Sequence, residues 1–189
     1  MIAVLALLLA SSVQAGQTID RLLAVVAGDP IFLSDVRQAE TLKLIDNGGT
    51  LAQVTAMTGA PAAQMPLEQL INRRLVLAEV TRYQQPAPLA ADLDRALETW
   101  SARFSNEAAR DAAIESAAGG SRAAVRAFLA DSLRIDRYLD QRFAAAAAPT
   151  RDEVAAGGSD ARRLALVRDW LAALRNRATV QVVSSERER

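Results

Sequence analysis

The chain has 189 residues, and 51% of them are apolar, which is enough to bury the core of one ordinary domain. Lys and Arg together number 22, as do Asp and Glu, so the net charge is zero and nucleic acid is not an expected partner. The chain contains neither cysteine nor histidine. This excludes thiol nucleophiles, Ser-His-Asp triads, histidine bases, disulfides and Cys/His zinc sites within it.

The first residues predict export. The sequence MIAVLALLLASSVQAGQ has an apolar run over 2–10 and then Val13-Gln14-Ala15, which fits signal-peptidase cleavage after Ala15. The run is too short to cross a bilayer. No Lys or Arg follows Met1, so either the true start lies upstream or the signal is weak; a buried N-terminal helix is the other reading. We expect a signal peptide over 1–15, a periplasmic location, and no stable membrane insertion after cleavage.

Two short strands around a tight turn follow. IDRLLAVVA (19–27) predicts the first strand, Gly28-Asp29-Pro30 the turn, and 31–33 the second strand. Ser34 is expected to cap the next helix, which should continue to about Asp46 and stop at the sequence NGG.

Most of the remaining chain has helical periodicity. The helix over 66–83 should be central in the core, because it carries an apolar stripe, widened by Leu77 and Val80, that consists of Leu67, Leu70, Ile71, Leu75 and Ala78. Apolar residues recur at helical spacing on the two long helices that follow: Val125, Phe128, Leu129, Ile135, Leu139, Phe143, Leu164, Val167, Leu171 and Leu174. Asn106 and Ser121 are expected to cap two helices, and Thr150 with Glu153 should form a capping box. The expected helices cover 50–57, 66–83, 89–104, 107–118, 122–144 and 160–178.

The sequence TVQVV (179–183) is the one other alternating β-branched segment. An isolated hairpin is marginally stable in water, so this segment should pair with the N-terminal strands. The predicted fold class is therefore mainly α, a multi-helix module with a small antiparallel sheet that joins the N-terminal hairpin to the C-terminal strand. We expect one domain over 16–183, in which 160–183 completes 16–156, followed by a polar tail over 184–189.

No motif indicates catalysis, so no catalytic, cofactor-binding or metal-binding residue is assigned and the protein is not expected to be an enzyme. The Gly-Gly pairs lack the lysine of a phosphate-binding loop. The paired carboxylates, Asp92 with Asp94 and Asp152 with Glu153, stand near predicted helix starts, where acidic groups stabilise the helix dipole. The arginines of INRR (71–74) and ARRL (161–164) are expected on solvated helix faces.

Two apolar features allow a binding function. Trp100 and Phe104 lie one helical turn apart, and a place in the core is the favoured interpretation, with part of a client groove as the alternative. Met57 and Met65 flank a weakly patterned connection, and methionine adapts to varied partners. Residues that would contact a client cannot be named from the sequence.

Four segments together resemble the SurA family of periplasmic chaperones. IDRLLAVVAGDPIFLSDV (19–36) resembles the family's opening strand pair and helix start, and LEQLINRRLVLAEVTRY (67–83) is similar to its central helix. FLADSLRIDRYLDQRF with PTRDEV resembles the long helix and capped short helix that end the chaperone module. WLAALRNRATVQVV (170–183) resembles the closing helix and strand. These matches occur in the family's order from Ile19 to Val183.

The chain departs from the family at one place. Members usually carry one or two parvulin-type prolyl isomerase domains before the closing helix, but here only AAGGS separates Val154 from Asp160. The resemblance therefore implies the chaperone module alone: an ATP-independent holdase for unfolded envelope or outer-membrane proteins, without cofactor or isomerase activity. The alternative is an envelope adaptor or accessory subunit that binds one folded partner. The oligomeric state is not predicted.

Overall fold

The computed structural model describes residues 20–45, 49–144 and 158–183 and is mainly α with a small antiparallel sheet, as the sequence predicts. The signal peptide over 1–15, the Thr150/Glu153 capping box and the tail over 184–189 lie outside the described residues. The strands are β1 (Leu22–Val26), β2 (Asp29–Phe32) and β3 (Val180–Val182). The helices are α1 (Leu33–Thr41), α2 (Thr50–Ala56), the 3-10 turn η1 (Ala62–Gln64), α3 (Met65–Arg82), α4 (Ala90–Ser101), α5 (Glu107–Ser116), α6 (Arg122–Phe143) and α8 (Gly158–Arg177).

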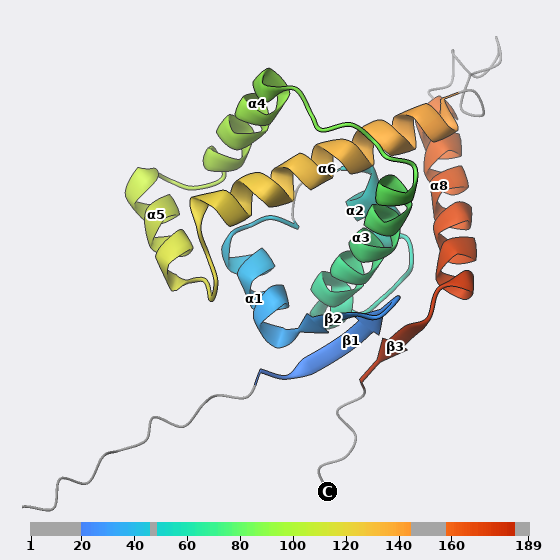
Figure 1. Ribbon diagram of the computed structural model, residues 1–189, viewed down its shortest axis with the longest axis horizontal. Helices are drawn as coiled ribbons and strands as arrows, with labels where there is room; N and C mark the ends of the chain where they lie inside the picture. Colours follow the sequence, from blue (N-terminus) through green and yellow to red (C-terminus); the bar gives the residue numbers. More distant parts are fainter. Residues whose placement is uncertain (1–19, 46–48, 145–157, 184–189) are drawn as a thin grey trace, which may run out of the picture.

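The sheet has the order β2-β1-β3, so the predicted pairing between the N-terminal hairpin and the C-terminal strand is confirmed. β1 and β3 are antiparallel, with Ala24 opposite Val182. The Val183 amide donates to the Leu23 carbonyl at 2.8 Å. Figure 1 shows the sheet along one side of the molecule, with β3 entering it directly from the end of α8.

The hairpin turn lies one step earlier than predicted. Ala27 and Gly28 form it with φ of 52° and 94°, while Asp29 and Pro30 already belong to β2. A two-residue turn with positive φ at both central positions matches the right-handed twist of its strands. The expected turn over 28–30 is therefore wrong by one residue, and the second strand starts at Asp29.

Helix α1 differs from the prediction at its start. It begins at Leu33, and the Asp35 carboxylate accepts a hydrogen bond from the Phe32 amide at 2.8 Å. The Ser34 hydroxyl instead donates to Asp20, which precedes β1. Ser34 is thus not the N-cap. The Ser34 side chain connects α1 to the residue that precedes the sheet. The carboxylate of Asp35, not the hydroxyl of Ser34, bonds to the backbone at the helix N-terminus.

Helix α1 also ends at Thr41 and does not reach Asp46. Lys43 adopts a positive φ of 50°, which turns the chain and directs Leu42 and Leu44 into the interior. The Trp100 indole N–H donates to the Leu42 carbonyl at 2.7 Å, so a distant helix satisfies the polar backbone of this turn. The helix thus ends because Leu42 and Leu44 are buried against distant parts of the chain. The local helical pattern does not contain this information.

Two apolar clusters share the long helix α6. The first combines the sheet with α1, α2, α3, α8 and the C-terminal half of α6, and the second combines Leu42 and Leu44 with α4, α5 and the N-terminal half of α6. Phe128 packs against both clusters. In Figure 1, α6 crosses the molecule from the α4–α5 end to α8, with α3 beneath it.

Helix α3 is central, as predicted. Its buried residues lie on more than one side, and they include polar side chains as well as most of the predicted stripe. Ala78 is the exception, since it is exposed although it was placed on the stripe. The apolar residues expected on the other long helices are confirmed as buried or packed against the core: Val125, Phe128, Leu129, Ile135, Leu139, Phe143, Leu164, Val167, Leu171 and Leu174.

The two predicted caps are confirmed. The Ala109 amide donates to the Asn106 side chain at 2.8 Å, and the Ala124 amide donates to the Ser121 hydroxyl at 3.0 Å. Helix α5 ends at Ser116, not at 118. Gly120 explains why the chain turns so tightly there: a Cβ on it would lie 2.3 Å from the Ile114 carbonyl oxygen.

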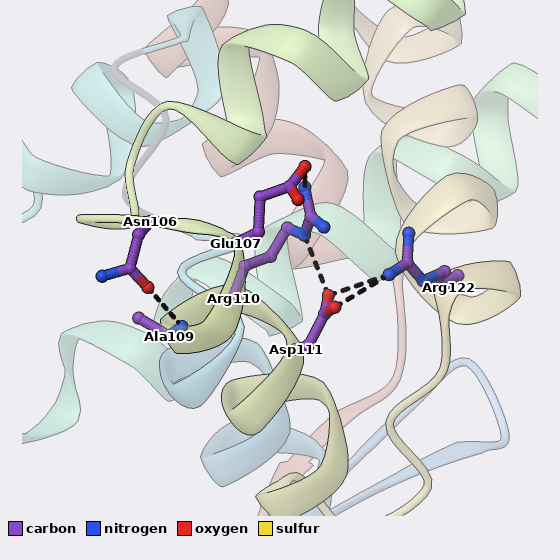
Figure 2. A network of polar contacts seen from close by, with 6 residues as sticks. All are labelled: Asn106, Glu107, Ala109, Arg110, Asp111 and Arg122. Atoms are coloured by element: carbon purple, nitrogen blue, oxygen red, sulfur yellow. Dashed lines mark hydrogen bonds and ion pairs between the residues drawn. The ribbon is translucent and has the colours of Figure 1, made fainter.

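A polar network holds α5 against the start of α6. Figure 2 shows the Asp111 carboxylate between two guanidinium groups, those of Arg110 and Arg122. Arg122 contacts both oxygens of Asp111, at 2.9 and 3.1 Å. Because Arg122 and Asp111 are both largely exposed, this contact orients the two helices more than it stabilises them.

The closing strand supplies a first prediction. A chain that ends at Ala178 lacks β3 and leaves β1 with a single neighbour, so it should lose at least about 3 kcal/mol of unfolding free energy, or about 10 °C in Tm. Thermal unfolding followed by circular dichroism measures the change. A chain that ends at Val183 is the matched control and should unfold like the full chain. Equal stability of the two truncated chains would contradict the closing role of β3.

Candidate functional site

A crevice of about 340 Å³ opens between α1, α3 and α6. Apolar side chains form most of its wall, and charged groups stand among them. A volume of this size lies near the lower end of the roughly 300–1,000 Å³ of ordinary ligand pockets. The lining residues are Ile31, Asp35, Gln38, Ala39, Leu44, Leu70, Arg73, Arg74, Leu77, Ala124, Ala127, Phe128 and Asp131.

Arg73 is the unusual member of this wall, because only 9% of it is exposed. Its guanidinium carbon lies 3.6 Å from the centre of the Phe128 ring. One terminal nitrogen donates to the Phe128 carbonyl at 2.7 Å, and the other donates to the Ser132 hydroxyl at 2.9 Å. The Arg73 guanidinium therefore joins α3 to α6 through a cation–π contact and two hydrogen bonds.

Arg73 keeps its positive charge although burial disfavours the charged form. Desolvation lowers the pKa of Arg73 to about 10, while the nearby carboxylates of Asp131 and Asp136 act in the opposite direction. The pKa still lies well above neutrality, so the side chain is a cation at physiological pH. The crevice thus combines apolar walls with the buried cation of Arg73 and with three further charged side chains, those of Asp35, Arg74 and Asp131.

Arg73 also separates the crevice from a smaller cavity of about 40 Å³. Ile45, Leu51, Ile135 and Asp136 are among the residues around it. Leu44, Arg73 and Phe128 line both spaces, so together they form the wall between them. Burial, helped by Asp140, raises the pKa of the Asp136 carboxyl, while Arg163 and Arg73 oppose the shift.

The crevice residues were not assigned from the sequence, and the expectation for INRR is wrong at Arg73. Arg74 is exposed as predicted, but Arg73 and its neighbour Asn72 are buried. Asn72 donates to the Thr55 hydroxyl at 3.0 Å. A signal was present: Arg73 lies three residues after Leu70 and four before Leu77, which places it on the same helix face as apolar residues.

Of the two carboxylate pairs, the one that the structure describes lies near the start of a helix, as predicted. Asp92 lies in the first turn of α4 and pairs with Arg95 at 3.3 Å, and Asp94 pairs with Arg126 at 3.4 Å. Neither contacts the crevice. The second pair, Asp152 with Glu153, lies outside the described residues. In the ARRL segment Arg163 pairs with Asp140 on α6, which is a surface role.

Trp100 belongs to the core, as the favoured interpretation states. It is 3% exposed, and Phe104 meets it edge to face at 5.3 Å between ring centres. Neither residue lines the crevice. Met57 caps the end of α2 and is exposed, and Met65 begins α3; they also lie outside the crevice lining. The structure thus places none of the residues singled out for client binding at the crevice.

Replacement of Arg73 tests its role in joining α3 to α6. Arg73→Ala removes the packing on Phe128 and both hydrogen bonds, so we expect the unfolding free energy to fall by about 2 to 4 kcal/mol. Chemical denaturation measures the loss. Arg74→Ala, one residue along and exposed, is the matched control and should change stability by less than about 0.5 kcal/mol. Similar losses in both variants would show that Arg73 does not hold the helices together.

Asp136 gives a prediction in pH. The pKa of Asp136 is raised in the folded state, so the ionised carboxylate destabilises the fold relative to the unfolded chain. This loss of stability should disappear as the pH drops through the folded-state pKa towards the ordinary value of 3.8. Asp136→Asn should therefore raise Tm at neutral pH, with an advantage that disappears below pH 3.8. Asp94→Asn, at a largely exposed site, should give no such gain. An Asp136→Asn variant that is less stable than the parent at neutral pH would contradict this account.

Within the described part of the chain, no helix combines the length and the apolar character needed to cross a membrane. The same residues contain no group of three or more acidic side chains placed to hold a metal ion. A comparison with protein-family models, curated proteins and solved structures finds no match to this chain. What the protein binds must therefore be inferred from the chemistry of its own surface.

Proposed function

We propose that this protein is an ATP-independent periplasmic holdase that binds unfolded segments of envelope or outer-membrane proteins. The observation that carries the proposal is the crevice between α1, α3 and α6, with its apolar walls and the buried cation of Arg73 among them. The confirmed fold class agrees with the chaperone module that the SurA-like segments imply. The predicted signal peptide over 1–15 supports the periplasmic location.

The chemistry of the crevice suits transient binding of apolar segments. Burial of apolar surface is favourable without regard to direction, so walls of leucine, isoleucine, alanine and phenylalanine accept many side chains. The guanidinium of Arg73 can attract a carbonyl or an aromatic ring of the client. Ordering a flexible client costs entropy, so binding to each segment is weak and release needs no nucleotide.

An aggregation assay tests the proposal. The protein is purified after expression of the full chain and titrated against an unfolded outer-membrane protein while denaturant is diluted, with light scattering as the readout. We expect suppression near stoichiometric ratios without ATP. A folded protein that gives no suppression would favour the alternative, an adaptor with one folded partner. A proline-limited refolding assay should proceed at the uncatalysed rate.

A pair of variants on α6 links the activity to the crevice. Ala127 is exposed and lines the crevice, so Ala127→Glu should place bulk and charge at its mouth and raise the protein concentration needed for half-suppression by about tenfold. Ala123→Glu makes the same change one turn away, outside the lining, and should leave suppression unchanged. Equal activity of both variants would place client binding elsewhere.

A further inference from the structure

The outer edge of β3 carries backbone groups that face away from the sheet. The Val183 amide donates to Leu23, and the Thr179 carbonyl accepts from Ala27 at 2.9 Å. Alternate residues of an antiparallel strand face the partner, so the N–H and C=O groups of Val180 and Val182 point to the open side. No backbone hydrogen bond to Val180 or Val182 from another strand or loop occurs on that side among the described residues.

The two edges of the sheet are protected differently. β2 carries Asp29 and Pro30 at its exposed start, and both residue types discourage the addition of another strand. β3 reads Val180-Gln181-Val182 and contains no proline and no charge. Among the residues that the structure describes, nothing pairs with the outer edge of β3, which can accept a further strand, whereas Asp29 and Pro30 disfavour such an addition at β2.

A groove of about 660 Å³ between β1, α1 and α3 reaches the C-terminal end of this open edge, where Val182 and Val183 line it. Val182 faces the same side of the sheet as Ala24, its buried partner in the register, yet it is 49% exposed because it borders the groove. A strand added next to β3 would therefore meet the groove at the positions beside Val182 and Val183. The lining residues are Arg21, Leu22, Leu23, Leu33, Val36, Arg37, Glu40, Ala63, Gln64, Pro66, Leu67, Glu68, Val182 and Val183.

The groove has a surplus of positive charge. Glu68 is already engaged by Arg175, which contacts both of its carboxylate oxygens. Arg21 and Arg37 form no ion pair with any other residue that the structure describes. Against these two free cations the lining offers only the carboxylate of Glu40. An occupant that brings a carboxylate is therefore electrostatically complementary.

We infer that an extended segment of an unfolded client binds as a fourth strand along β3, with an apolar side chain in the groove beside Val182 and Val183 and an acidic residue near Arg21 and Arg37. This inference rests on the proposed function and adds a second client site, separate from the crevice, that recognises the client backbone. Main-chain hydrogen bonds to Val180 and Val182 supply affinity for any extended segment, and the groove selects an apolar side chain at the position that reaches it.

A proline variant tests the added strand. Val182→Pro removes an N–H that does not bond to β1, so the sheet should keep its native pairing while one outward donor is lost. The probe is a fluorescent peptide of about eight residues that alternates valine with serine and carries one glutamate. We expect the variant to bind it about tenfold more weakly, because the peptide carbonyl loses its donor. Val182→Thr keeps shape and N–H, and its affinity should stay within about twofold.

Hydrogen exchange locates the peptide without any mutation. The Val180 and Val182 amides should become protected when the peptide binds, because they gain hydrogen bonds. The Val183 amide, already bonded to Leu23, is an internal reference and should not change. Exchanging the glutamate of the peptide for lysine should weaken binding, because Arg21 and Arg37 would then repel it.

The outcomes separate this inference from the holdase proposal. If the parent protein suppresses aggregation but Val182→Pro binds the peptide as the parent does, strand addition is wrong and the holdase proposal stands. Protection of Val180 and Val182 in a protein that never suppresses aggregation would leave the strand site standing and overturn the holdase proposal. A parent dimer that Val182→Pro converts to a monomer would show that a second copy occupies the edge, and would overturn the inference.

Discussion

The pairing of β1 with β3 is the interaction on which the rest of the structure depends. β1 is the middle strand, and its two neighbours come from opposite ends of the described chain. Ala24 and Val26 are buried only because helices pack over the face that this pairing completes. Near the same place, the Arg175–Glu68 contact joins the end of α8 to the start of α3. The helices between β2 and β3 are thus held in a closed loop of chain.

Helix α6 provides the second constraint, since it belongs to both apolar clusters. Arg73 reaches it from α3 with a charged group inside the protein, an arrangement that is stable only because Phe128 and Ser132 satisfy the guanidinium. A hydrophobic residue in its place could fill the same volume. The cation instead fixes the relative position of two helices and places a charged group in the wall of a largely apolar crevice.

The sequence predicts the fold correctly where a segment allows a single structural interpretation. The hairpin and TVQVV are the segments with β-strand character after residue 18, so their pairing follows, and Asn106 and Ser121 are recognisable caps because each directly precedes a run of helix-forming residues. The end of α1 was missed because Leu42 and Leu44 extend the helical pattern although they are buried against Trp100. Ser34 was misassigned because Asp35, its neighbour, could serve the helix entrance equally well.

The crevice was harder to predict than the fold. Arg73 and Arg74 are adjacent and chemically identical, and both lie three or four residues from apolar residues of α3, so the spacing shows that an arginine can be buried there but the packing of α3 against α6 decides which one. Likewise, the open edge of β3 follows from strand order, which the pattern of TVQVV does not contain. Local sequence determines which elements form, whereas a binding surface depends on how distant elements meet.

The closure of the sheet has a consequence for biosynthesis. β1 is the first described strand to leave the ribosome, and β3, which completes its second side, is the last described element to be made. Contacts between residues so far apart in sequence form slowly. The native sheet cannot assemble before residues 180–182 have left the ribosome, so every shorter nascent chain leaves one side of β1 unpaired and accessible to proteases.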